Sequence, residues 1–178
     1  MARYAAFLAA INVGGNRLLM TELRQALERE EFEAVETVVA SGNVLFSHDE
    51  RPSDGLAEKL AYVLRDRFDI DTFAAVRSRD EVRGAIEDNP FAGVGEDKFA
   101  HTHFLEGQPS QAQFDALVAA YEGRGREKLA LGDRALYVDY VDGMGTSKLT
   151  GPFIERRLGC RGTARNVRSL QRILDKMD

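Results

Sequence analysis

The sequence contains a single cysteine, Cys160, and no long apolar run. One cysteine cannot form an internal disulfide bond, and no segment approaches the ~20 consecutive apolar residues that a membrane-spanning helix needs. Residues 1–8 also lack the pattern of a secretory signal peptide. From these absences we expect a protein of the reducing cytoplasm, without membrane contact.

An excess of positive charge is absent as well. The chain has 24 Lys and Arg residues against 29 Asp and Glu residues, which gives a formal net charge of -5. This charge provides no general attraction for nucleic acid or for an anionic membrane surface. The length of 178 residues and a hydrophobic share of 44% are enough for the chain to bury a core of its own. We therefore expect a folded protein that is not a general nucleic-acid binder.

Positive charge is concentrated near the end of the chain. Residues 148–178 carry a net charge of +5, whereas the preceding residues carry -10. Two explanations stay open. The basic segment can pack on an acidic body through weak surface ion pairs, or its arginines can form a binding site for a carboxylate or a phosphate.

The first half of the chain alternates β-rich and amphipathic segments. Residues 3–10 form an apolar run that is too short for a helix, and Gly42 with Asn43 separates two further β-rich runs, as a hairpin turn would. We expect strands at 3–10, 34–40, 44–47 and 72–77, and helices capped by Thr21 and starting at 52–54. The resulting β-α-β-β-α-β order is typical of a ferredoxin-like domain.

The second half repeats the β-α-β-β order without repeating the sequence. Two capping boxes, Ser78 with Glu81 and Ser110 with Gln113, indicate helix starts. The expected elements are a helix at 79–88, a linker at 91–98, a strand at 99–105, a helix after Ser110, a hairpin of 128–131 and 134–140 that turns at Gly132 and Asp133, and closing helices at 151–158 and 166–177.

These elements predict an α+β fold made of two ferredoxin-like βαββ halves with extra C-terminal helices. The expected halves are residues 1–90 and 91–178, which together form one compact unit. The helix after Ser110 carries Phe114, Leu117, Val118 and Tyr121, and the last helix should bury Val167, Leu170, Leu174 and Met177.

Glycine-rich loops offer the first candidate for binding chemistry. Asn12, Gly14 and Gly15 lie between a predicted buried strand and a predicted helix, where backbone amides can point at an anion. The spacing matches neither a dinucleotide-binding loop nor a P-loop. Glycines that only permit a tight connection explain this segment equally well, and Ser41-Gly42-Asn43 by itself is explained as a turn.

Two segments near the C-terminus add cations. Residues 143–148 place glycines, Ser147 and Lys148 before a predicted helix, and Arg165 with Asn166 precedes the last helix. The alternative for both segments is ordinary helix capping by Ser, Thr or Asn, which we favour for residues 143–148. Arg165 would then face either a cleft or solvent.

Metal binding and nucleophilic catalysis receive little support. His101 and His103 share one face of a predicted strand, but no Cys or acidic residue has a suitable ligand spacing, so we expect two half-exposed histidines and no metal. Cys160 lies beside Arg157 and Arg161, which could lower its thiol pKa, yet no base accompanies it. No motif assigns a reaction or a cofactor, and whether the protein is an enzyme stays open.

Six motifs follow one another over nearly the whole chain: FLAAINVGG at 7–15, MTEL at 20–23, SGNVLF at 41–46, NPF at 89–91, SKLT at 147–150 and TARN at 163–166. Together they resemble the domain of unknown function 1697 family. The resemblance implies a compact bacterial α+β protein with ferredoxin-like halves and no established activity. Two departures, Ala9-Ala10 where the family has Arg-Gly and Val167 where it has Trp, remove a cation and a stacking surface, which weakens a nucleotide-binding interpretation.

Because these motifs lie on predicted loops rather than on core faces, we expect them to share a site. The leading hypothesis is that the protein binds a small anionic ligand, a nucleotide or a phosphorylated metabolite. A protein-interaction module and an enzyme of unrecognised chemistry in the same cleft are the alternatives. We expect Arg165 to be functional rather than structural. The predicted site residues are Asn12, Gly14, Gly15, Ser41, Gly42, Asn43, Ser147, Lys148, Arg165 and Asn166.

Overall fold

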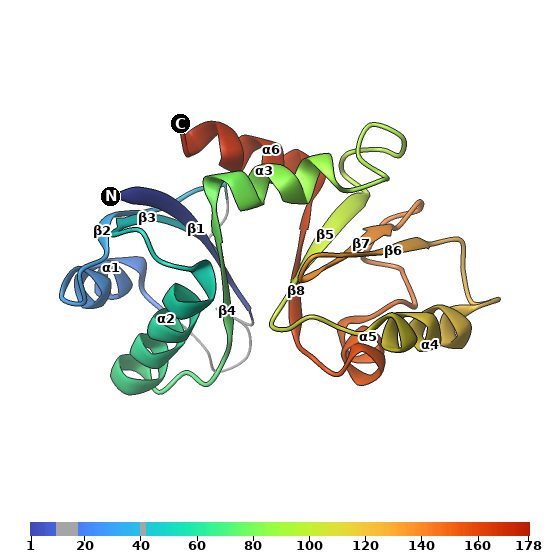
Figure 1. Cartoon of the computed structure of the whole chain (residues 1–178), viewed down its shortest axis with the longest axis horizontal. Helices are drawn as coiled ribbons and strands as arrows, with labels where there is room; N and C mark the ends of the chain where they lie inside the picture. The colour runs from blue at the N-terminus through green and yellow to red at the C-terminus, as the bar shows by residue number, and fades with distance from the viewer. Residues whose placement is uncertain (10–17, 40–41) are drawn as a thin grey trace. The chain divides into compact units, whose positions relative to one another are not determined.

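The computed structural model describes residues 1–9, 18–39 and 42–178. The chain divides into two compact units: a first unit of Met1–Val82 with Arg172–Asp178, and a second unit of Arg83–Gln171. Each unit contains a four-stranded antiparallel sheet and helices (Figure 1). This confirms the predicted α+β fold with two halves.

The first sheet has the strand order β2-β3-β1-β4 and is covered on one face by two helices (Figure 1). Leu27 and Leu60, one from each helix, share a buried cluster with Phe46 and Val76 of the sheet. The apolar spacing of both helices therefore predicts this packing correctly. The elements are β1 (Ala2–Leu8), α1 (Met20–Glu28), β2 (Glu33–Thr37), β3 (Asn43–His48), α2 (Ser53–Phe68) and β4 (Ala74–Ser78).

The second sheet has the order β6-β7-β5-β8. Leu117 and Ile154, from its two covering helices, pack with Leu136 and Val138 of the sheet. None of the described helices is both long and apolar enough to cross a membrane. The elements are β5 (Ala100–Leu105), α4 (Gln111–Tyr121), β6 (Lys128–Gly132), β7 (Ala135–Asp139), α5 (Gly151–Leu158) and β8 (Gly162–Asn166), with α3 (Arg79–Glu87) directly after β4 and α6 (Val167–Lys176) directly after β8.

Both predicted capping boxes are present. The Ser78 hydroxyl accepts a hydrogen bond from the Glu81 amide at 3.2 Å, and the Glu81 carboxylate accepts one from the Ser78 amide at 2.9 Å. Ser110 and Gln113 form the same pair of bonds. Gly159 ends α5 with a left-handed φ of 75°, as the sequence predicts. These features were predictable because each depends only on residues a few positions apart.

Strand β8 was not predicted. All of residues 162–166 pair with β5, from Gly162 opposite Leu105 to Asn166 opposite His101. Their sequence, GTARN, has no alternation of apolar and polar residues, which is the signal on which strand prediction depends. The pairing with a strand far earlier in the chain, rather than local preference, makes this segment a strand.

The second hairpin turns one residue later than predicted. Gly132 lies opposite Ala135, so Asp133 and Arg134 form the turn, and Arg134 has a φ of 48°. The Gln108 side chain supports this turn: it accepts from the Arg134 amide at 2.6 Å and donates to the Gly132 carbonyl at 3.2 Å. Gly132 is needed for space instead, because a Cβ atom there would lie 2.5 Å from Cε2 of Tyr137.

The predicted capping role of Thr21 is wrong, and Val118 on α4 (Gln111–Tyr121) faces outward. Helix α1 begins at Met20 after Leu19, with no side-chain cap, so Thr21 lies inside the helix and does not cap it. Val118 is 41% exposed, whereas its neighbour Leu117 is fully buried. Successive helical residues are ~100° apart around the axis, so only a narrow face of α4 reaches the core.

The close approach at Gly132 predicts a loss of stability on adding one methyl group. Gly132→Ala should lower the free energy of unfolding by about 1–3 kcal/mol, because the buried Tyr137 ring must move. Gly55→Ala is the control: a Cβ atom there meets nothing within 4 Å in α2, so the helix should gain about 0.5–1 kcal/mol. Urea unfolding measures the stability of both variants. Equal effects would contradict the conclusion that the Tyr137 ring requires a glycine at position 132.

Candidate functional site

The predicted site residues are distributed over both units. Asn12, Gly14, Gly15 and Ser41 lie outside the described residues. Gly42 and Asn43 belong to the first unit, and Ser147, Lys148, Arg165 and Asn166 belong to the second. That all ten form one site stays a prediction.

In the first unit, the two ends of the predicted glycine loops meet at one end of the sheet. The Leu8 amide at the end of β1 donates a hydrogen bond to the Gly42 carbonyl at 2.9 Å. In the same register, Phe7 lies opposite Asn43. The chain therefore leaves β1 after Leu8, beside the point where it enters β3.

Asn43 is a strand residue rather than a turn residue. It is only 2% exposed, and its carbonyl accepts a hydrogen bond from the Val38 amide at 3.0 Å. The predicted hairpin exists, but Asn43 is the first residue of β3. A buried amide side chain at this position makes Asn43 a fixed polar group at the end of the sheet.

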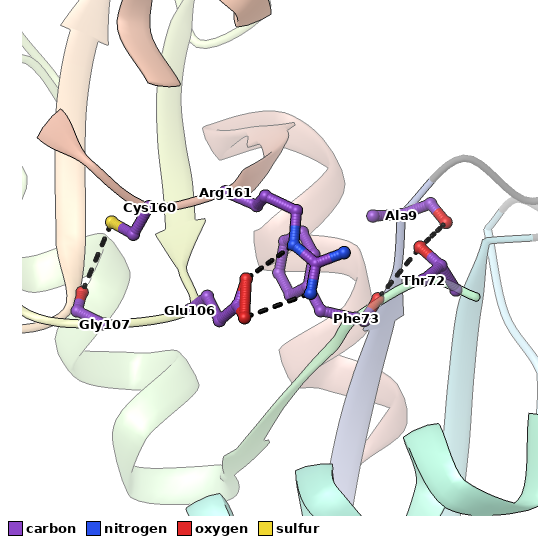
Figure 2. Close-up of polar contacts among 7 residues, drawn as sticks. All are labelled: Ala9, Thr72, Phe73, Glu106, Gly107, Cys160 and Arg161. Carbon is purple, nitrogen blue, oxygen red and sulfur yellow. Dashed lines mark hydrogen bonds and ion pairs between the residues drawn. The ribbon is translucent and has the colours of Figure 1, made fainter. Parts of the chain in front are cut away.

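Thr72 makes a hydrogen bond beside the end of β1 that sequence reasoning missed. Its hydroxyl donates a hydrogen bond of 2.7 Å to the carbonyl of Ala9, which joins the chain before β4 to the chain after β1 (Figure 2). Thr72 is 7% exposed. No sequence signal indicates this bond, because Thr72 and Ala9 are far apart along the chain and Thr is common at strand starts.

In the second unit, Ser147 holds its loop in place and does not cap a helix. Its hydroxyl donates to the Glu127 carboxylate at 3.1 Å and accepts from the Leu149 amide at 3.0 Å. The hydroxyl of Tyr121 also donates to Glu127. The cap of α5 is Thr150, whose hydroxyl accepts from the Phe153 amide. The capping that we favoured for residues 143–148 is therefore wrong for Ser147.

Burial raises the pKa of Tyr121, and the hydrogen bond to Glu127 raises it further. Tyr121 therefore keeps its proton at neutral pH and remains a donor to the carboxylate. Lys148 follows Ser147 directly and is exposed. The Tyr121–Glu127–Ser147 chain of hydrogen bonds thus fixes the backbone from which the Lys148 side chain extends.

Arg165 lies within β8, opposite Thr102, and is half-buried. Its Nη1 donates to the hydroxyl of Thr163 at 2.7 Å and to the carbonyl of Ala164 at 2.9 Å. Burial lowers its pKa to about 10, so the guanidinium is charged at neutral pH. The strand, rather than a helix cap, fixes the position of Arg165.

Asn166 has the predicted capping role. Its Oδ1 accepts a hydrogen bond from the Ser169 amide in the first turn of α6 at 2.8 Å. Its Nδ2 donates to the Lys98 carbonyl at 3.4 Å. With both side-chain groups engaged, Asn166 holds the junction between β8 and α6.

The two strand histidines are buried, not half-exposed as predicted. His101 is 7% exposed and His103 is 5% exposed, and Nε2 of His103 lies 2.8 Å from the Tyr140 hydroxyl oxygen. Burial, with His101 nearby, lowers the pKa of His103 to about 3. Among the described residues no group of His, Cys, Asp and Glu side chains could hold a metal ion.

The Cys160 thiol is not activated by its neighbours. Burial raises its pKa, and its Sγ lies 3.9 Å from the Gly107 carbonyl oxygen (Figure 2). Arg161 instead forms a two-pronged ion pair with Glu106, with distances of 2.6 and 3.0 Å (Figure 2). The possibility that the adjacent arginines lower the thiol pKa is therefore wrong.

The bond from Thr72 to Ala9 predicts a specific cost. Thr72→Val keeps the shape of the side chain but leaves the Ala9 carbonyl without this donor, so the free energy of unfolding should fall by about 1 kcal/mol or more. Thr37→Val, at an exposed position of β2, should change it by less than about 0.5 kcal/mol. Equal losses in urea unfolding would show that the hydroxyl of Thr72 has no special role.

His103 should make the protein less stable in acid. The folded protein keeps this ring neutral to about pH 3, whereas the unfolded chain binds a proton below about pH 6.5. This contribution is complete above pH 6.5 and is lost as the pH falls towards 3. Urea unfolding at about pH 4.5 should show that His103 contributes a loss of roughly 2–3 kcal/mol relative to neutral pH. His103→Gln should make the free energy of unfolding depend less on pH between 6.5 and 3. If the pH dependence is the same in this variant, His103 is not its cause.

Comparison with known proteins adds fold and family but no activity. A structure described as "conserved bacterial protein SP0830 from Streptococcus pneumoniae" superposes with a TM-score of 0.72 at 24% identity, covering 99% of each chain. That likeness concerns the fold alone. No curated protein matches the chain. The family model described as "Protein of unknown function (DUF1697)" matches residues 1–137, and the chain belongs to that family.

Proposed function

We propose that this protein binds a small anionic ligand, a nucleotide or a phosphorylated metabolite, through its Gly, Asn and Ser loops. The observation that carries the proposal is the arrangement at the end of the first sheet. There the hydrogen bond from Leu8 to Gly42 places the chain just before the Asn12–Gly15 motif beside the end of the Ser41–Asn43 motif. The hydrogen bond from Thr72 to Ala9 ties the same point of the chain to the segment before β4. Two segments rich in glycine and Asn therefore leave the sheet from adjacent points.

This chemistry suits an anion. Asn12, Gly14 and Gly15 follow shortly after Ala9, and Ser41 comes directly before Gly42. Glycine loops expose backbone N–H groups, and successive amides of this kind form concave sites for phosphate or carboxylate oxygens. The buried Asn43 adds a fixed amide at the same end of the sheet.

The proposed cations are Lys148 and Arg165, with Ser147 and Asn166 as positioning residues. Arg165 belongs to strand β8, and its guanidinium donates a hydrogen bond to Thr163. The planar guanidinium therefore has a fixed position before a ligand binds. The guanidinium is charged at neutral pH, so it can form charge-assisted hydrogen bonds to an anionic group. This supports Arg165 as the strongest single contributor to anion binding.

Two finer statements go with this proposal. We interpret each half as ferredoxin-like, because the first unit has the order β-α-β-β-α-β and both sheets have corresponding strand orders. We also place the protein in the cytoplasm, since its single cysteine requires no oxidising compartment.

The proposal is tested by thermal unfolding with inorganic phosphate, sulfate, a sugar phosphate and nucleotides at constant ionic strength. A ligand at a hundred times its dissociation constant should add about 2.7 kcal/mol of stability. No stabilisation by any of these anions would overturn the proposal. A specific partner protein recovered by pull-down, with no response to anions, would favour an interaction module instead.

Arg165→Ala should abolish the stabilisation by the anion that performs best in that screen. The change should itself cost about 1 kcal/mol, because the Thr163 hydroxyl loses its bond to a half-buried guanidinium. Arg168→Ala removes the same charge from an exposed position of α6 and should leave anion binding intact. If both variants respond to the anion as the unaltered protein does, Arg165 is structural.

A further inference from the structure

A cavity of about 620 Å³ lies at the end of the first sheet opposite to Leu8 and Asn43. Its lining includes the first residues of β1 and the last residue of β4, Ser78, which lies opposite Tyr4. At ~3.3 Å per residue, the seven residues of β1 separate the two ends of the sheet by roughly 20 Å. The cavity is therefore distinct from the site proposed above.

Three arginines, Arg3, Arg51 and Arg79, line this cavity. The guanidinium of Arg3 already has protein partners: it forms an ion pair with Glu36 at 2.7 Å and donates a hydrogen bond to the Ala34 carbonyl at 2.8 Å. The other two arginines are differently placed. They determine what the cavity can bind.

Arg51 is held by its backbone and has a free side chain. Tyr4, 3% exposed and stacked on Phe46, donates its hydroxyl proton to the Arg51 carbonyl at 3.0 Å. The same hydroxyl oxygen accepts from the Arg51 amide at 3.1 Å. Within the part of the chain that the structure describes, the Arg51 guanidinium has no hydrogen bond or ion pair. A fixed backbone thus presents an available cation.

Arg79 has a buried donor without an acceptor. It is the first residue of α3, directly after Ser78 and within the Ser78–Glu81 capping box, and its Nη2 forms an ion pair with Asp178. Its Nε, in contrast, is buried and has no hydrogen-bond partner among the described residues. An unpaired buried donor is destabilising, and an anion that reaches it would supply the missing acceptor.

We propose that this cavity binds a compact oxyanion, a carboxylate or a phosphate monoester, between Arg79 and Arg51. An oxygen of the ligand would accept the hydrogen bond from Arg79 Nε, and the guanidinium of Arg51 would complete the charge balance. Glu50 and Asp80 also line the cavity. These carboxylates repel a polyanion, so the site takes a single anionic group and rejects triphosphates and nucleic acid.

The apolar part of the lining supports the same ligand class. Ala2, Tyr4 and Pro52 supply hydrocarbon surface beside the two arginines. A small metabolite with one anionic group and a short apolar or hydroxylated body matches this combination of charge and apolar surface. Inorganic phosphate and acetate are the minimal probes for the two forms of the anionic group.

The test follows the Nε–H resonances of the arginines by ¹H–¹⁵N NMR spectroscopy of the whole chain. Phosphate or acetate, added at constant ionic strength against chloride, should move the Arg79 Nε–H resonance along a saturable curve. If phosphate has the lower dissociation constant, the natural ligand is a phosphate monoester; if acetate has the lower one, it is a carboxylate. A triphosphate should bind at least about tenfold more weakly per anionic group.

Matched variants locate the site. Arg51→Ala should raise the dissociation constant about tenfold, because one charge-assisted hydrogen bond is lost. Arg24→Ala removes the same charge from an exposed position of α1 in the same unit and should change it less than about twofold. Asp178→Asn frees the Arg79 fork and should tighten binding.

Three results would overturn the proposal: an Arg79 Nε–H resonance that no probe moves, equal losses in the Arg51 and Arg24 variants, or saturation that Arg165→Ala abolishes and Arg51→Ala does not. The last result would assign the anion to the site of the proposed function. Conversely, anion binding that survives Arg51→Ala and Arg79→Ala leaves that function intact and removes only this inference.

Discussion

The antiparallel pairing of β1 with both β3 and β4 is the constraint on which the first unit depends. Because side chains alternate along a strand, a slip of one residue would turn Tyr4, Ala6 and Leu8 out of the core. The same register places Ala9 and Gly42 at one end of the sheet and the arginine cavity at the other. Both binding proposals for this unit are therefore consequences of one packing requirement, which only a buried apolar face can enforce.

Local sequence rules predicted the elements whose causes are local. The Ser78 and Ser110 capping boxes, the stop at Gly159 and the apolar faces of α1 and α2 each depend on residues within one or two helical turns. Strand β8 could not be predicted this way, because residues 162–166 become a strand only through pairing with β5. The position of the turn after β6 was predicted wrongly for a related reason. Gly132 is required because the Tyr137 ring packs against it, and not because the turn needs a glycine.

The polar residues show why the candidate site was harder to predict than the fold. Strand periodicity shows that His101 and His103 share a face, but it does not show whether that face is covered, and both proved buried. The same uncertainty reversed the expected direction of the Cys160 pKa, because burial outweighed the adjacent arginines. Asn166 was predicted correctly since its partner, the Ser169 amide, is three residues away. The Thr72 bond to Ala9 had no sequence signal at all.

Local geometry, rather than net charge, decides where this chain can hold an anion. Its charge of -5 acts weakly beyond the screening length of ~8 Å at physiological salt, so a fixed arginine dominates its own surroundings. The resemblance to the family implies an arginine at the position that Ala9 occupies here. The bond from Thr72 uses the Ala9 backbone carbonyl, so it does not depend on that side chain. A different side chain at this position would therefore leave that bond in place, and the positive charge of each proposed site comes from residues elsewhere in the chain.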